Sequence, residues 1–451
     1  MSGSTPPARK GAMALLASRR FGPLFATQFL SAFNDNAVKN ALVLMLAYRA
    51  AAGGRMAAQL LIPLAGALFI LPFFLFSAFA GELADRSDKA RLVRLIKSVE
   101  IAVMAAAAAG LLAGQIGTLL GVLFAMGVEA AFFGPIKYAI LPDLLAPGEV
   151  LLGNALVEAG TFLAILLGTM AGMLIALGDG GVVVTVLIVL VAIAAWCASL
   201  GIPGIPPMAA AMARRWNLFA ATARLIREAA RGSPSGRAPI AFRAILGISW
   251  FWLVGATYLA QFPSYVRFVL GAQEAVVTLF LTVFSVGIAA GSLICNRLLG
   301  GRVSAATVPW GALGIGLFSI DLWLASPASL HPAETSPLTT LGAFVIAPGN
   351  WRILCDLFAV AVCGGLFVVP LYALLQTATE AGHRARAIAA NNVINSAAMV
   401  VSAVATMALL ALGLPVPGLF VLFGTATLPI AAWLRRALAA AVPAPVVPAN
   451  R

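Results

Sequence analysis

Strongly polar side chains interrupt the first long apolar stretch of the chain. Asn34, Asp35, Asn36, Lys39 and Asn40 fall within seven residues of one another. A charge at the centre of a bilayer costs about 2.5–3.5 kcal/mol, so such residues must face a polar interior and find partners there. Asp35 and Lys39 are one helical turn apart and can form an ion pair. Because a structural ion pair would leave the asparagines unexplained, the segment predicts a substrate-binding cavity.

Other ionisable groups lie in later apolar stretches. Glu129, Phe133 and Lys137 recur every four residues, which keeps them near one face of a helix. With Lys39 they can form a polar cleft in the first half of the chain. Glu100 and Asp356, by contrast, are expected near helix ends, where they would snorkel. The full set of predicted substrate-binding residues is Asn34, Asp35, Asn36, Lys39, Glu129, Lys137, Tyr138, Asn154, Glu158, Asn391, Asn392 and Asn395.

The second half of the chain differs in kind. The aromatic stretch around Trp250 and Trp252 contains no charge between Arg243 and Arg267, and the stretch at 391–395 offers amides only. One half is therefore ionic and the other aromatic and amide-lined. That contrast suits an amphiphile whose headgroup binds the first half, although an aromatic helix that merely packs or faces lipid is an equally good explanation.

A charged motif follows the second apolar stretch, at residues 81–91. Gly81 permits close approach of a neighbouring helix, and Asp85 can lie at a helix N-terminus or pair with a cation. We therefore predict gating roles for Gly81, Asp85, Arg86 and Lys89. The alternative is an ordinary basic loop.

The composition requires a membrane to position these residues. The 451 residues are 62% hydrophobic and 10% charged, whereas soluble domains are about 45–50% apolar and about 25% charged. Apolar windows predict an all-α membrane protein with twelve transmembrane helices. Their expected ranges are 21–48, 57–80, 92–113, 117–139, 150–178, 181–202, 241–269, 273–299, 306–325, 352–378, 390–412 and 415–437.

The basic residues set the predicted topology. With both termini inside, 24 Lys and Arg residues lie on the cytoplasmic side, four lie outside and Lys39 is embedded, as the positive-inside rule requires. This distribution accounts for the net charge of +13 without a nucleic-acid partner. The expected organisation is a cytoplasmic N-terminus (1–20), two six-helix bundles (21–202 and 241–437) joined by a cytoplasmic linker (203–240), and a tail or onward linker (438–451). Residues 210–231 predict a basic amphipathic helix, or else a solvated linker.

The two halves also repeat. The segment around Tyr138 matches the segment around Tyr372 at an offset of 234 (372 − 138), and Thr169-Met170-Ala171 matches Thr406-Met407-Ala408 at an offset of 237 (406 − 169). Two parallel six-helix repeats are typical of the major facilitator architecture.

The sequence contains no catalytic pattern. Its two histidines have no nucleophile pattern nearby, no Gly-Lys-Ser/Thr phosphate loop is present, and the four cysteines lack CxxC spacing. We expect no enzyme activity, no cofactor and no metal.

Three segments resemble the signatures of the bacterial lysophospholipid transporters of the major facilitator superfamily: 28–36, 133–140 and 153–158. Segments 369–376 and 383–392 look closer to the transporter domain of fusions that also contain an acyltransferase and an acyl carrier protein ligase. The resemblance implies that lysophospholipids with ethanolamine or glycerol headgroups move from the outer to the inner leaflet of the bacterial inner membrane for reacylation, without ion coupling.

The resemblance also implies headgroup or gating roles for Asp35 and Lys137, with Asn34, Asn36 and Glu158 beside them. One departure is the lack of an arginine between Arg243 and Arg267, inside the helix expected at 241–269, which makes Lys39 or Lys137 the expected partner of Asp35. The expected partners are the lysophospholipid, membrane lipids and a fused or separate acyltransferase. Two alternatives stay open, a proton-coupled efflux pump for amphipathic drugs and a non-transporting anchor of an acyltransferase.

Overall fold

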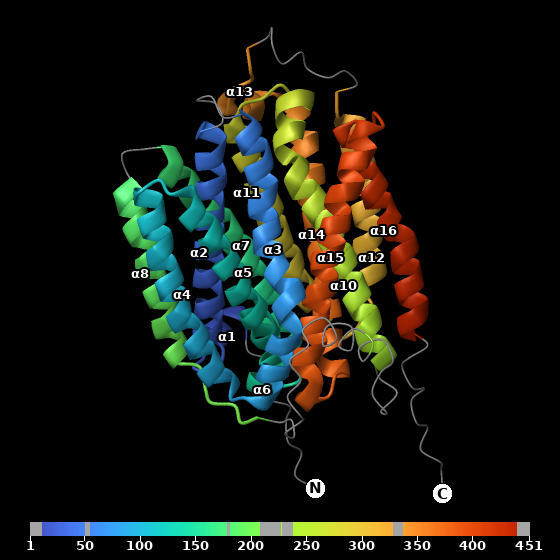
Figure 1. Ribbon diagram of the computed structural model, residues 1–451. Helices are drawn as coiled ribbons and strands as arrows, with labels where there is room; N and C mark the ends of the chain where they lie inside the picture. Colours follow the sequence, from blue (N-terminus) through green and yellow to red (C-terminus); the bar gives the residue numbers. More distant parts are fainter. Residues whose placement is uncertain are drawn as a thin grey trace, which may run out of the picture.

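The computed structural model describes residues 11–49, 55–177, 181–207, 227, 238–327 and 337–439. Twelve helices of 18 residues or more dominate these ranges, in two sets of six (Figure 1). The first set is α2 (Gly22–Arg49), α3 (Arg55–Arg86), α4 (Lys89–Leu112), α5 (Ile116–Ala139), α7 (Val150–Leu177) and α8 (Gly181–Leu200). The second set is α10 (Ala238–Ser264), α11 (Glu274–Leu298), α12 (Val308–Ala325), α14 (Pro348–Ala378), α15 (Arg384–Ala411) and α16 (Val416–Ala439). The shorter elements are α1 (Ala12–Leu16), α6 (Leu141–Leu144), α13 (Leu341–Ile346), the π-helix η2 (Tyr265–Val269) and the 3₁₀-helix η3 (Ala381–His383).

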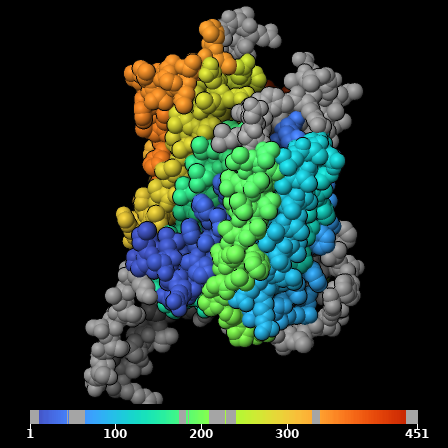
Figure 2. All heavy atoms as spheres, turned by 90° about the vertical axis from the view of Figure 1, so that its left-hand side faces the viewer, coloured from blue at the N-terminus to red at the C-terminus, as the bar shows by residue number. Residues whose placement is uncertain are grey.

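The helices are suited to a lipid environment. Ten of them are long and apolar enough to cross a membrane, and Thr185–Leu200 of α8 is a shorter apolar helix. Figure 2 shows α8 and α4 side by side on the outside of the first set. Large apolar side chains of α8 face outward there, including Val183 at 72% exposure and Leu190 at 55%. Since water would penalise such a surface, these observations confirm an all-α, multi-pass membrane fold.

The two sets pack as two halves that lie side by side (Figure 1). Within the first half α2 packs on α7 and α3 on α5, and within the second α11 and α12 both pack on α14. The halves meet where α3 and α5 contact α15 and where α7 contacts α11. Glycines allow some of these helices to approach closely. A Cβ on Gly291 of α11, for example, would lie 2.0 Å from the backbone oxygen of Val362 on α14.

The helix bounds differ most from the sequence expectation around the motif at 81–91 and at the start of α15, which begins at Arg384 and not near residue 390. Helix α3 continues to Arg86, and α4 begins already at Lys89 because Asp88 caps it by accepting hydrogen bonds from the backbone N–H groups of Ala90 and Arg91. The motif therefore spans two helix ends rather than a loop. The amphipathic helix predicted at 210–231 falls outside the described residues, apart from residue 227.

Candidate functional site

A cavity of about 470 Å³ lies between the two halves. The first half lines it with α2, α3, α5 and α7, and the second half with α10, α14 and α15. Eight of the twelve predicted substrate-binding residues line this cavity: Asp35, Asn36, Lys39, Glu129, Lys137, Tyr138, Asn392 and Asn395. The polar residues of the first apolar stretch therefore do share a cavity with those of α5 and α15.

Three charged side chains in the cavity wall are available to a ligand. The Lys39 ammonium lies 4.5 Å from the ring centroid of Phe69, and the Lys137 ammonium lies 4.9 Å from that of Tyr138. In the described part of the chain no salt bridge within 4.0 Å joins Asp35 to Lys39, although their opposite charges attract each other at longer range. Each ammonium group contacts the face of an aromatic ring. The Asp35 carboxylate lies in the same cavity wall.

A buried ion cluster lies behind the first half's wall. Lys97 is fully buried, and its ammonium pairs with Glu100 at 2.8 Å and with Glu129. Ser31 donates a hydrogen bond of 2.9 Å to Glu100, and the Lys97 ammonium lies 3.9 Å from the centroid of the Phe133 ring. Buried charges need such pairing because desolvation is costly. The cluster ties α2, α4 and α5 together and presents Glu129 to the cavity.

The cluster corrects two expectations. Lys97, which the topology count placed among the cytoplasmic basic residues, is fully buried inside the bundle, and Glu100 lies mid-helix at 2% exposure instead of snorkelling from a helix end. Asp356, also expected to snorkel, is 4% exposed within α14. The cause is the early start of α4 at Lys89, which places both α4 charges deeper than apolar windows suggest.

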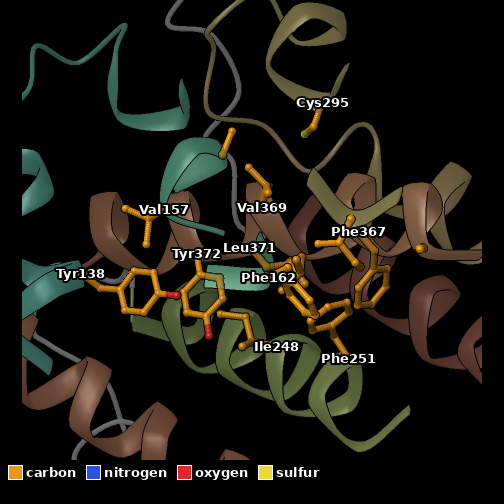
Figure 3. Packing of buried hydrophobic residues seen from close by; sticks show 14 of the residues in the cluster. Tyr138, Val157, Phe162, Ile248, Phe251, Cys295, Phe367, Val369, Leu371 and Tyr372 are labelled. Carbon is orange, nitrogen blue, oxygen red and sulfur yellow. The ribbon is translucent and has the colours of Figure 1, made fainter. Parts of the chain in front are cut away.

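The floor of the cavity is a pair of stacked tyrosines, one from each half. The rings of Tyr138 on α5 and Tyr372 on α14 are 4.5 Å apart between centroids and 6° from parallel (Figure 3). The Tyr138 hydroxyl donates to Glu158 at 2.5 Å, and the Trp252 indole donates to the Tyr372 hydroxyl at 3.0 Å. These bonds fix both ring planes, so the floor is held from both halves.

Beyond the stacked tyrosines, toward the ends of α3 and α15, polar contacts join the two halves. We call this end of the molecule the basic face and define it by residues 86–94, 384–386 and 435–436. There the Asp85 carboxylate accepts hydrogen bonds from the backbone N–H groups of Ala385 at 3.0 Å and Arg386 at 3.2 Å, and from the Arg386 guanidinium at 3.2 Å. These N–H groups are the unsatisfied donors at the start of α15, where the helix dipole favours an anion.

Gly81 allows that contact to form. A Cβ at Gly81 would lie 2.7 Å from the Cβ of Ala389 and 3.0 Å from the carbonyl oxygen of Ala385. Helices α3 and α15 can therefore pack this closely only around a residue without a side chain. A gating role for Gly81 and Asp85 stays a prediction.

A second connection between the halves lies nearby. Asp143 accepts from Lys89 at 3.0 Å within the first half and from Arg384 of the second half at 2.8 Å. Arg86 instead pairs with Glu82 one turn earlier on its own helix, at 2.5 Å. Lys89 thus supports the connection, whereas the described ion pair of Arg86 does not cross between the halves. Together these contacts close the cavity on the basic face.

Four predicted residues do not line the cavity. The amide of Asn34 donates to the carbonyl of Ile188 on α8 at 3.0 Å. Asn154 exchanges two hydrogen bonds with Gln376 of the other half, at 2.7 and 2.8 Å. Glu158 lies behind Tyr138, and Asn391 is fully buried in α15. Asn154 therefore joins the two halves, whereas the hydrogen bond of Glu158 lies within the first half.

Several residues of the site were missed from the sequence. Trp252 and Tyr372 line the cavity, and Asp143, Gln376 and Arg384 connect the halves. Tyr372 had a signal, since the internal repeat pairs it with Tyr138. Asp143 had none, because a single acid after an apolar stretch is typical of many loops.

The cavity wall as a whole suits an amphiphile with a charged headgroup. The first half contributes Asp35, Glu129, Lys39 and Lys137, whereas the described lining of the second half is uncharged and includes Trp252 and Met399. Groups of three or more side chains suited to a metal ion are absent from the described residues.

Comparisons with known proteins agree with this geometry. The chain is 29% identical over 430 residues to the lysophospholipid transporter LplT of Escherichia coli O1:K1 / APEC, covering 93% of this chain and 97% of that protein. It is also 29% identical over 415 residues to the LplT of Escherichia coli O9:H4 (strain HS), covering 90% and 93%.

Solved structures share the fold at low identity. The human organic anion transporter MFSD10 (TETRAN) matches with a TM-score of 0.71 at 15% identity, over 94% of this chain and 100% of that one. The proton:xylose symporter XylE bound to 6-bromo-6-deoxy-D-glucose matches with a TM-score of 0.67 at 14% identity, over 92% and 94%. The family model of the Major Facilitator Superfamily matches residues 24–403, and the chain therefore belongs to this superfamily of transporters.

Proposed function

We propose that this protein is a lysophospholipid transporter that moves its substrate from the outer to the inner leaflet of a bacterial inner membrane. An acyltransferase, separate or fused, would then reacylate the product. The names of the relatives at 29% identity support this substrate class. The observation that carries the proposal is the division of the central cavity into one ionic wall and one aromatic, amide-lined wall.

The charges of the first half can bind a phosphate and an ammonium group together. Glu129 already pairs with Lys97, which leaves Asp35 as the carboxylate for a headgroup cation. Lys39 and Lys137 provide ammonium groups for the phosphate. Trp252 and Met399 on the opposite wall then provide apolar surface for the acyl chain.

The orientation follows from the charges at the helix ends. The basic face gathers eight Lys and Arg residues at the ends of α3, α4, α15 and α16, so we place it in the cytoplasm together with both termini. The contacts between the halves on this face support the proposal that this conformation has its cavity closed toward the cytoplasm. Such a state is the one that receives a substrate from the outer leaflet.

Reconstituted protein provides the test. Proteoliposomes would be loaded with labelled lysophosphatidylethanolamine in the outer leaflet, and transfer would be measured as protection from albumin extraction. We expect transfer in the wild type and at least tenfold slower transfer in Asp35→Asn and Lys137→Gln, because each loses a charge-assisted contact of roughly 1.5–3 kcal/mol. Glu82→Gln, which alters a carboxylate away from the cavity, is the matched control. Absence of transfer, or equal rates in all four proteins, would refute the proposal.

A proton-coupled drug efflux pump is the second candidate, because Glu100 and Glu129 are buried carboxylates within the bundle. The two carboxylates share the single Lys97 ammonium, so one of the two negative charges has no balancing cation and this candidate needs its own test. Collapse of the proton gradient in the same assay separates the two functions. It would stop an efflux pump and leave lysophospholipid transfer unchanged.

A further inference from the structure

A second, larger groove lies on the outside of the second half. It has a volume of about 870 Å³ and is formed by the start of α10, the loop before α12, α12 itself and the end of α16. Its described lining includes Ile240, Val303, Trp310, Leu313, Ala432 and Arg435. The central cavity shares none of these residues, so the groove is a separate feature, which we call the α12/α16 groove.

The groove is open to the surroundings of the bundle. Trp310 is 70% exposed and Leu313 is 48% exposed, and both belong to the lining. Figure 1 places the lower ends of α10, α12 and α16 next to one another, at the end of the molecule that contains the basic face. In a membrane this apolar groove faces lipid, at the level of one leaflet.

The positive charge of Arg435 in the groove favours lipids that have an anionic headgroup. Arg435 is the one charged side chain in its described lining, and it is exposed at the end of α16. Tryptophan rings such as that of Trp310 favour the depth of the headgroups, so Arg435 lies where a lipid phosphate would be. Basic pockets between helices on the cytoplasmic side bind anionic headgroups. A zwitterionic headgroup would find no carboxylate in this lining for its ammonium group.

We propose that the α12/α16 groove binds an intact phospholipid with a net negative headgroup, its acyl chains along α12 and α16 and its phosphate on Arg435. This site is distinct from the transport cavity, and the proposal stands whichever substrate that cavity transports.

Neighbouring residues on α16 provide a matched pair of variants. Arg435 and Arg436 are both exposed at the end of the same helix, but only Arg435 lines the groove. Arg435→Gln and Arg436→Gln therefore change the net charge equally and differ only in the groove. Ala432→Trp adds bulk at an exposed lining position and tests the acyl-chain part of the site.

The experiment is native mass spectrometry of the full chain released from mixed phosphatidylglycerol and phosphatidylethanolamine membranes. We expect the wild type and Arg436→Gln to retain phosphatidylglycerol in preference to phosphatidylethanolamine. Arg435→Gln should lower that preference about fivefold, the effect of one arginine near an anionic lipid. Ala432→Trp should lower phosphatidylglycerol retention outright. The melting temperature of every variant should stay within a few degrees of the wild type, which shows that each one is folded.

Three results would overturn the proposal. An equal loss in both arginine variants would mean that the basic surface attracts lipid without a groove. Retention of phosphatidylethanolamine to the same extent would remove the role of charge. Wild type without retained phospholipid would mean that the groove is filled by another segment of this chain.

Discussion

Replacing Arg384 by glutamine should open the basic face. Arg384 donates to Asp143 across the two halves at 2.8 Å, and Asp143 keeps a second partner, Lys89, within its own half at 3.0 Å. The variant therefore removes an interaction that exists only while the face is closed, and leaves no buried carboxylate without a cation. The Arg384 side chain is 17% exposed, so water replaces part of the lost contact.

The magnitude follows from these contacts. A hydrogen bond to a charged group is worth about 1.5–3 kcal/mol, and partial exposure favours the lower end of that range. A loss of about 1.4 kcal/mol changes an equilibrium tenfold. We therefore expect the ratio of open to closed molecules at the basic face to rise about tenfold in Arg384→Gln.

Spin labels across the basic face measure this ratio. Cysteines at Ser87 and Thr377, in a background without the four native cysteines, place one label on each half. Arg384→Gln should increase the population of long distances between the two spin labels, as measured by pulsed electron paramagnetic resonance. Arg20→Gln is the control, because its ion pair with Glu149 at 2.6 Å lies within the first half. Identical distances in Arg384→Gln and the parent, or an equal shift in Arg20→Gln, would refute the reasoning.

Three further variants test other contacts. Gly81→Val should slow lysophospholipid transfer at least tenfold, because its Cβ would lie 2.7 Å from the Cβ of Ala389; transfer at the parent rate would show that α3 and α15 do not need this approach. Lys97→Met should destabilise the protein by about 3–5 kcal/mol, since two glutamates would lose their shared cation. Combining Lys97→Met with Glu129→Gln should recover part of that lost stability, measured by thermal unfolding. If the double variant were no more stable than the single one, the ion cluster would not be the cause. Tyr138→Phe keeps the stacked ring but removes the hydroxyl that donates a hydrogen bond to Glu158, so it should lower stability by about 1–3 kcal/mol. An unchanged melting temperature would show that this hydrogen bond does not stabilise the fold.

The fold follows from the sequence because its signals are local. Twenty apolar residues specify a spanning helix whatever lies beside it, and arginines between spans specify its direction. The same locality explains the cavity residues on α2 and α5, since Asp35 and Lys137 cannot face lipid.

The pairing between residues was harder to predict because it depends on how distant helices face each other. Asp35 and Lys39 are one turn apart, yet each has different neighbours in the folded bundle. Lys97 was counted among the cytoplasmic basic residues because apolar windows ignore the Asp88 cap that starts α4 early and so places Lys97 deeper in the helix. Asp143 connects to Arg384 across 241 residues of sequence, and neither position contains a pattern that indicates the other.

The stacked tyrosines have a consequence for how the two repeats diverged. Tyr138 and Tyr372 occupy equivalent positions, 234 residues apart (372 − 138), and touch each other. Equivalent positions can touch only close to the pseudo-twofold axis, where, as in a symmetric dimer, a residue meets its own copy. In an ancestor with identical halves, any residue here had to be compatible with itself, which permits a stacked aromatic pair and disfavours a charge. Lys137 and Leu371, one position earlier, were free of that constraint and became different, so the ionic half and the apolar half could arise from one ancestral bundle.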